Sequence, residues 1–295
     1  MALGAVGVVV VVVGVIIGVS LSGSGGGGTK AHSSDSYALP SYLVKQVTAV
    51  PVGTMVALAK AEPAADTSAP QKLPASAPPL TSGGKPEVLY MGAEYCPFCA
   101  GERWALVMAL SKFGTFSDLR GTTSSSTDVY PLTPTFSFYG SSYKSSYLSF
   151  APVELETTNE NQTLQNPTPQ QTNLISKWDV APYTTEAGAI PFIYMGGKYI
   201  LTGIQFDASK LSGMQFATAA SYLTSGKNAT SKAVEASAAY LVGDFCALTH
   251  GQPGSVCSMV PAHLKGISAS SPSGKGSSKA TATTGKTTTT KKATS

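Results

Sequence analysis

The chain has 295 residues, of which only 12% are charged, and its formal net charge is +4. Residues 266–295 contain five lysines and no acidic residue, so residues 1–265 carry a net charge of −1. This balance leaves no excess of Lys and Arg for a phosphate backbone, and no nucleic-acid partner is expected. The charged share is well below the roughly 25% that is usual for globular proteins. Such a composition, rich in Ser, Thr, Gly and Ala, is common in secreted and wall-associated proteins.

Residues 2–21 carry no charge and are almost wholly apolar, and a run of this length can span a bilayer. No Lys or Arg precedes the run, whereas a cleaved signal peptide has a basic first region. We therefore predict a transmembrane signal-anchor at residues 1–21, with cleavage and secretion as the alternative. The 4 cysteines form two local pairs, which fits an oxidising compartment. The predicted location is the cell membrane, with a single span and the rest of the chain outside the cytoplasm.

Composition divides the remaining chain into four parts. Residues 22–36 are a Gly- and Ser-rich flexible linker. Residues 37–85 form an N-terminal extension, with a helix near residues 39–48, a short extended piece and then a Pro-rich stretch that cannot be helical. Residues 86–262 form the main domain. Residues 263–295 are a Ser/Thr/Lys tail, which is too polar to bury a core and should be disordered.

The main domain is organised around Cys96-Pro97-Phe98-Cys99. The apolar residues 88–91 predict a short buried strand, and a helical pattern follows over residues 97–113. Pro97 suits the first turn of a helix, so Cys96 lies at the helix N-terminus. Free N–H groups and the helix dipole favour an anion there, which indicates a reactive thiolate at Cys96.

A second landmark lies far downstream, where Pro191 precedes two short apolar runs. Phe192–Met195 and Tyr199–Thr202 fit two strands, and Gly196 and Gly197 fit the hairpin turn between them. Further along, a capped helix is expected after Thr168, and helices are expected over residues 210–224 and 230–245.

Together these motifs resemble the thioredoxin superfamily. Ala93-Glu94-Tyr95-Cys96-Pro97-Phe98-Cys99 is similar to that family's active-site segment, and its Cys-Pro-aromatic-Cys centre is closest to glutaredoxins. More narrowly, the chain resembles an uncharacterised family of membrane-anchored prokaryotic proteins with a thioredoxin-like domain. The resemblance covers about residues 40–262, and that narrower family has no established reaction.

The resemblance implies an α/β thioredoxin-like fold and thiol–disulfide exchange on proteins. Cys96 and Cys99 would be catalytic, with Cys96 as the exposed nucleophile and Cys99 as the buried partner that resolves the mixed disulfide. The Ile190–Pro191 peptide would be cis and lie against Cys96. The client would contact Tyr95, Pro97, Phe98, Pro191 and the Ile190 backbone.

The strand of residues 135–139 would be the second core strand. The interval between Cys96 and Pro191 is about twice that of a minimal thioredoxin, so an insertion is expected at about residues 140–180.

The resemblance does not define the direction of the reaction. Tyr90 stands where thioredoxins carry a buried Asp, and Phe98 stands where strong oxidants carry His. Trp104 is expected to pack between helix and sheet. Arg103 lies one turn after Cys99 and is expected to be solvent-exposed, with support of a thiolate as the alternative. Glu94 is expected to lie at an outer position without a role in proton transfer. Thiol and disulfide proteins are the expected clients, and a membrane disulfide carrier is suggested as a partner by the resemblance alone. No cofactor is expected.

Two alternatives remain open. A structural zinc site would need ligands from Cys246, Cys257, His250 or His263, but ten residues separate the two cysteines, which is unlike a zinc ribbon. A non-catalytic, membrane-anchored binding module could instead use the Cys96–Cys99 pair as a structural disulfide. Gly251, Pro253 and Gly254 let the chain turn back, so we predict a structural disulfide between Cys246 and Cys257. A second redox pair is the alternative there.

Overall fold

The computed structural model describes residues 32–61 and 69–265. The predicted anchor, the linker up to residue 31 and the tail from residue 266 onward lie outside these ranges. Within them, no single helix is long and apolar enough to cross a membrane. α1 (Ser41–Thr48) and α2 (Val52–Ala61) meet that criterion only as a pair bent by 53°, and only by length and composition.

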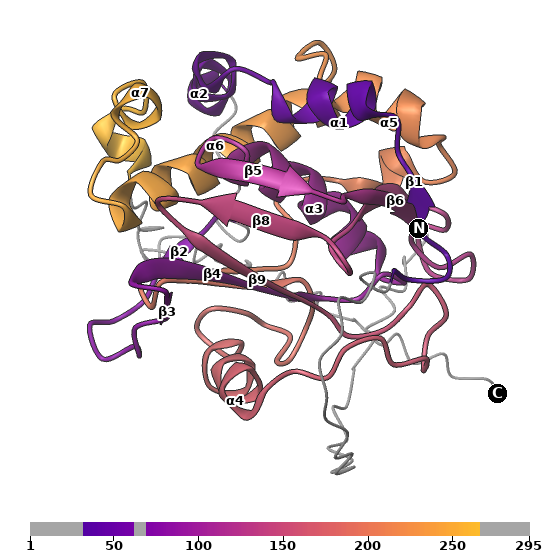
Figure 1. Cartoon of the computed structure of the whole chain (residues 1–295), viewed down its shortest axis with the longest axis horizontal. Coiled ribbons are helices and arrows are strands. Elements are labelled where there is room, and N and C mark those ends of the chain that lie inside the picture. Colours follow the sequence, from indigo (N-terminus) through magenta and orange to yellow (C-terminus); the bar gives the residue numbers. More distant parts are fainter. Residues whose placement is uncertain (1–31, 62–68, 266–295) are drawn as a thin grey trace, which may run out of the picture.

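A mixed sheet lies at the centre of the fold (Figure 1). Its strands in spatial order are β9 (Ser149–Glu154), β4 (Lys85–Gly92), β10 (Phe192–Met195), β11 (Tyr199–Thr202) and β2 (Gln71–Lys72). β4 and β9 are parallel, whereas β10 runs antiparallel to both β4 and β11. β3 (Thr81–Ser82) forms a short hairpin with the start of β4. The chain is thus a mixed α/β protein, and the predicted strand before Cys96 and the hairpin after Pro191 are confirmed.

The apolar residues of β4 alternate between two cores. Val88 and Tyr90 pack with α3 (Pro97–Leu110) and α6 (Ala229–Leu248) on one face of the sheet. Leu89 and Met91 pack with α4 (Pro169–Trp178) on the other face. Because successive strand residues point to opposite faces, one fully apolar strand can serve both layers. Figure 1 shows α4 alone below the sheet, with the other main helices above it.

Four strands lie between α3 and β9 in the sequence. Their pairing shows that residues 135–139 do not form the second strand of the central sheet, contrary to the prediction. These strands are β5 (Gly114–Ser117), β6 (Arg120–Thr123), β7 (Pro134–Ser137) and β8 (Ser142–Ser145). β7 is a strand as predicted, but it pairs with β6 in a separate three-stranded sheet completed by β1 (Tyr37–Ala38). β5 pairs with β8. The strand parallel to β4 is β9, which lies inside the stretch that was predicted to be an insertion.

The N-terminal extension contributes to the same core as α3 and α6. Leu43 and Val47 of α1 are buried there, and so are Met55 and Val56 of α2. The prediction of a short extended piece after the first helix is wrong, because those residues form α2. The Pro-rich part, where it is described, contains only the two-residue strands β2 and β3.

The later helices largely follow the prediction. Thr168 caps α4 through a capping box with Gln171. The helix expected over residues 210–224 is divided into a short 3₁₀ helix, η1 (Ala208–Leu211), and α5 (Phe216–Leu223). α6 covers the helix expected over residues 230–245 and is followed by α7 (Gly254–Cys257) and η2 (Ala262–Leu264).

Candidate functional site

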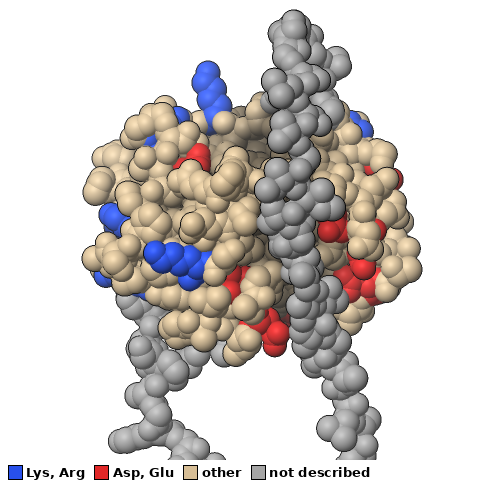
Figure 2. Space-filling view, turned by 90° about the horizontal axis from the view of Figure 1, so that it is seen from below, with Lys and Arg blue, Asp and Glu red and all other residues tan. Residues whose placement is uncertain are grey.

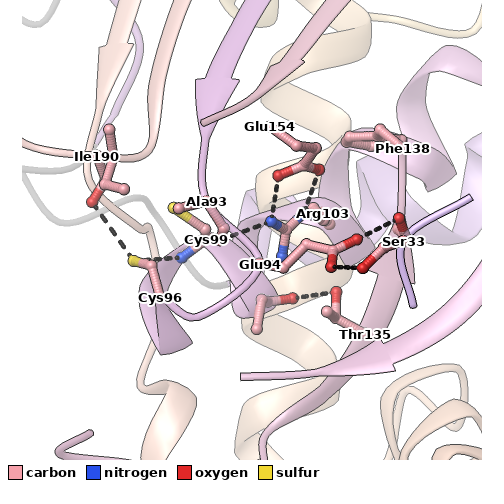
Figure 3. Close-up of polar contacts among 12 residues, drawn as sticks. Ser33, Ala93, Glu94, Cys96, Cys99, Arg103, Thr135, Phe138, Glu154 and Ile190 are labelled. Carbon is pink, nitrogen blue, oxygen red and sulfur yellow. Dashed lines mark hydrogen bonds and ion pairs between the residues drawn. The ribbon is translucent and has the colours of Figure 1, made fainter. Parts of the chain in front are cut away.

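The Cys-Pro-Phe-Cys segment lies where β4 runs into α3. Cys96 is the N-cap residue of α3, and Pro97 occupies its first turn. The Cys99 backbone N–H donates to the Cys96 sulfur over 3.3 Å (Figure 3). A sulfur at this position receives both a free N–H group and the positive end of the helix dipole, which stabilise a thiolate. The predicted placement of Cys96 is therefore confirmed.

The two thiols differ in acidity more than in exposure. Cys96 is only 5% exposed and Cys99 is fully buried, so the expectation of an exposed nucleophile is wrong for this conformation. Burial opposes ionisation of Cys96, but the side chain and backbone of Cys99, the charge of Arg103 and the Phe98 backbone together lower the pKa of its thiol. Burial and the neighbouring Cys96 raise the pKa of the Cys99 thiol well above its usual value.

The chain around Pro191 closes over the same sulfur. The Ile190–Pro191 peptide is cis, as predicted. β10 begins at the next residue, and its pairing of Phe192 with Met91 brings Ile190 beside the Cys96 segment. The Cys96 thiol lies 3.8 Å from the Ile190 carbonyl oxygen, to which it can donate (Figure 3). Two segments that are 94 residues apart in the sequence therefore meet at one sulfur atom.

Arg103 and Glu154 form a buried ion pair beneath this site. The Arg103 guanidinium donates to both oxygens of Glu154 over 2.9 and 2.6 Å, and to the Ala93 carbonyl over 2.8 Å (Figure 3). Both side chains are fully buried. Burial opposes the charge of Arg103, but Glu154 beside it holds the pKa of Arg103 above its usual value. The expectation that Arg103 is solvent-exposed is wrong, because neighbouring elements bury every residue of α3 except Phe98.

Glu94 is also buried, which corrects its predicted outer position. Its carboxylate accepts hydrogen bonds from the Ser33 hydroxyl over 2.6 Å and from the Ser137 hydroxyl. Burial and the nearby charge of Glu154 raise the pKa of the Glu94 carboxyl, while the hydrogen bonds from Ser137 and Ser33 act in the opposite direction. The first described residues of the chain thus contact a carboxyl group next to the cysteine motif.

The remaining predicted site residues are divided between interior and surface. Tyr95 and Pro97 are buried, whereas Phe98 is 39% exposed and packs edge-on against Tyr130. The Tyr95 carbonyl accepts from the Ser125 N–H. The loop that joins β6 to β7 therefore lies directly against the Cys-Pro-Phe-Cys segment, a neighbour that local sequence patterns did not indicate.

Trp104 and Tyr90 have the structural surroundings of core residues. Trp104 packs on Phe136 and Phe216 and donates to the Pro134 carbonyl, so the prediction that it is a packing residue is confirmed. Tyr90 is buried under Arg103, and burial raises its pKa well above 10.

Cys246 and Cys257 form the predicted disulfide, with 5.5 Å between their Cα atoms. It joins the end of α6 to α7 and lies in the main core. The disulfide also takes up two of the four candidate ligands of the zinc alternative. Among the described residues, no group of three His, Cys, Asp or Glu side chains could hold a metal ion.

Sequence reasoning missed Glu154, Ser33 and Ser137. One signal was available for Glu154, because it ends a mostly apolar strand while Arg103 interrupts an apolar helix. Charged residues in otherwise buried elements are usually paired with each other. Ser33 and Ser137 gave no comparable signal.

Comparison with known proteins gives one match. No curated protein and no solved structure matches this chain. A family model described as "Domain of unknown function (DUF929)" matches residues 71–242, which is more than half of the chain and includes both cysteines of the motif, Arg103, Glu154 and Pro191. The chain therefore belongs to the DUF929 family of proteins, whose function is unknown.

Proposed function

We propose that this protein is a thiol–disulfide oxidoreductase that acts on protein disulfides through Cys96 and Cys99. The observation that carries the proposal is the environment of the Cys96 sulfur. It accepts from the Cys99 N–H at the start of α3, faces the Ile190 carbonyl, and has a lowered pKa beside a Cys99 whose pKa is raised. A thiolate-prone cysteine next to a buried thiol is the arrangement that exchange chemistry needs.

The order of elements supports a thioredoxin-like interpretation of the fold. β4, α3 and β9 form a parallel β-α-β unit, and α4, the β10–β11 hairpin and α6 follow it. The cis Ile190–Pro191 peptide lies immediately before β10, opposite the cysteine motif. In this interpretation the insertion comprises β5 to β8 and precedes the second core strand, instead of following it at residues 140–180.

The exchange would proceed in two steps. The Cys96 thiolate attacks one sulfur of the client disulfide, a mixed disulfide forms, and the other client sulfur leaves as a thiolate. Cys99 then gives up its proton to the departed client thiolate and attacks the Cys96 sulfur. This attack breaks the mixed disulfide and releases the first client sulfur as a thiolate, which takes up a proton from solvent. The protein gains the Cys96–Cys99 disulfide and the client is reduced to two thiols. The same steps in reverse oxidise the client.

A location outside the cytoplasm, on the membrane, is part of the proposal. The apolar run at residues 2–21 supports the anchor, and the Cys246–Cys257 disulfide suits an oxidising compartment. The second candidate function is a membrane-anchored binding module without catalysis. The small exposure of Cys96 favours that alternative, because a buried sulfur reacts slowly.

The test is a stoichiometric exchange reaction. The reduced full-length protein is mixed with a short peptide disulfide, quenched with acid and analysed by mass spectrometry. We expect one Cys96–Cys99 disulfide to form for each peptide disulfide reduced, and Cys96→Ser to abolish both changes. If the wild-type protein keeps two free thiols while the peptide stays oxidised, and insulin is not reduced in parallel, the binding module is the better account.

A further inference from the structure

Four surface segments surround the Cys-Pro-Phe-Cys site, and together we call them the rim. They are residues 33–36, 124–133, 155–166 and 180–190. Each segment is tied to the site by a contact. The Ser33 hydroxyl binds Glu94, the Ser125 N–H binds the Tyr95 carbonyl, and the Glu156 carbonyl accepts from the Glu94 N–H. The fourth segment ends at Ile190, which faces Cys96.

The rim is acidic and contains neither Lys nor Arg. Its five acidic residues, none of them buried, are Asp35, Asp128, Glu156, Glu160 and Glu186. In the described part of the chain only three other acidic residues escape burial: Glu87, Asp118 and Asp207. In Figure 2 most of the visible acidic side chains lie right of and below the centre of the face, whereas one large basic group lies left of the centre and another projects from the upper edge. The acidic residues are therefore concentrated at the site rather than spread over the surface.

Two cations beside the rim make contacts within the chain. Arg120 donates to the side chain and the backbone of Ser36. Lys177 lies over the ring of Trp178. These contacts hold both side chains in place without cancelling their charges, but the five acidic residues outnumber them, so the rim keeps a negative field that an incoming partner would meet.

Apolar side chains are also exposed on the rim and on the Cys-Pro-Phe-Cys segment beside it. Phe98 is 39% exposed, Val129 60% and Leu132 47%, and the last two belong to the loop that contacts Tyr95. Cys96 itself is only 5% exposed, so a disulfide that reaches its sulfur comes close to the segments that contact the site. A folded surface or extended chain that does so is placed against both acidic and apolar groups.

We propose that the rim selects clients in which Lys or Arg flank the reactive cysteine within a mostly apolar segment. The inference rests on the proposed function and adds its substrate class. Opposite charges steer an encounter and align the partner, and salt screens the effect because the pairs are exposed. We expect a lysine-flanked peptide disulfide to react about tenfold faster than a glutamate-flanked one at low ionic strength, and less than about threefold faster at 0.5 M salt.

The experiment compares three peptide disulfides with identical sequences except for flanking Lys, Ser or Glu. The reduced full-length protein is used in an uncharged detergent. A rim variant, Glu156→Gln/Glu160→Gln/Glu186→Gln, is matched by a control of equal charge change, Glu87→Gln/Asp118→Asn/Asp207→Asn. We expect the preference for the Lys peptide to fall several-fold in the rim variant and to persist in the control.

Other results would contradict either the client preference alone or the proposed function as well. Equal rates with all three peptides, or an equal loss of preference in both variants, overturn this inference alone. Failure of every peptide to react overturns the proposed function as well. The five lysines of residues 266–295 are a competing cationic source. If the Lys preference emerges only when those five lysines are changed to Gln, the tail of the chain fills the rim and the client assignment is wrong.

Discussion

Changes at Arg103 and Glu154 should shift the pKa of Cys96 in opposite directions while destabilising the fold in both cases. The charge of Arg103 lowers the pKa of the Cys96 thiol, and Glu154 partly neutralises that charge. Arg103→Met removes the cation and should raise the pKa of Cys96. Glu154→Gln keeps a hydrogen-bond acceptor but removes the negative charge, so it should lower the pKa of Cys96 further.

The magnitudes follow from the burial of the pair. Both side chains are fully buried and joined by two hydrogen bonds, so removing one partner leaves an uncompensated charge. Breaking such a pair costs about 3–5 kcal/mol of folding free energy. A unit charge acting over roughly 10 Å through an effective dielectric of about 20 changes a pKa by on the order of one unit. That is the expected size of each shift.

The assay is the pH dependence of alkylation of Cys96 in reduced protein, with urea unfolding measured in parallel. Arg120→Met, which removes the only other arginine of the chain, is the matched control and should leave the pKa of Cys96 unchanged. Shifts of the same sign in Arg103→Met and Glu154→Gln would refute the electrostatic reasoning. They would indicate that both variants merely loosen the segment around Ala93, whose carbonyl Arg103 holds.

Three further predictions concern stability. Burial raises the pKa of Glu102 to about 8, with the backbone of Gln205 acting in the opposite direction. Between pH 4.5 and 8 the folded state therefore binds one more proton than the unfolded state, so the free energy of unfolding falls as pH rises through that range. Measured by urea unfolding, the free energy of unfolding of Glu102→Gln should exceed that of the wild type by up to about 5 kcal/mol at pH 9 and equal it at pH 4. Cys246→Ser/Cys257→Ser should lower the free energy of unfolding by about 2.8 kcal/mol, because the disulfide closes a loop of about 12 residues, and should keep full exchange activity. Loss of multiple-turnover exchange with unchanged stability would indicate that the pair relays electrons instead. Gly243→Ala should lower the free energy of unfolding by about 1–3 kcal/mol, because the added Cβ would clash with the backbone oxygen of Leu264 in η2. A neutral result by thermal unfolding would contradict that packing.

The elements that the sequence predicts well are those with strong local signals. β4 and the β10–β11 hairpin are apolar runs bounded by Gly and Pro, and α3 starts at Pro97. The Cys246–Cys257 pair is separated by only 11 positions, so a local turn suffices to join it. Each of these features is encoded within a short window of residues.

The parallel partner of β4 could not be found in this way. The alternating pattern of residues 135–139 is typical of a strand, whereas Ser149–Glu154 contains Pro152 and has weaker alternation. Pairing over about 60 residues depends on which strand the rest of the fold presents to β4, and no local pattern reports that choice.

The errors at Arg103 and Glu94 share a physical cause. Polar residues on a helix or a loop usually indicate a solvent-facing surface. Here β7 and α6 cover α3, and the segment around Ser33 covers Glu94. Their charges are therefore compensated inside the protein, by Glu154 for Arg103 and by serine hydroxyls for Glu94.

The measurement that tests the central claim most directly is competitive alkylation of the two cysteines in the reduced protein. At mildly acidic pH, a limiting amount of iodoacetamide is added and the modified site is mapped by mass spectrometry. The account predicts that Cys96 is modified first, because its pKa is lowered while that of Cys99 is raised. Modification of Cys99 before Cys96, or equal slow modification of both, would contradict the assignment of Cys96 as the nucleophile.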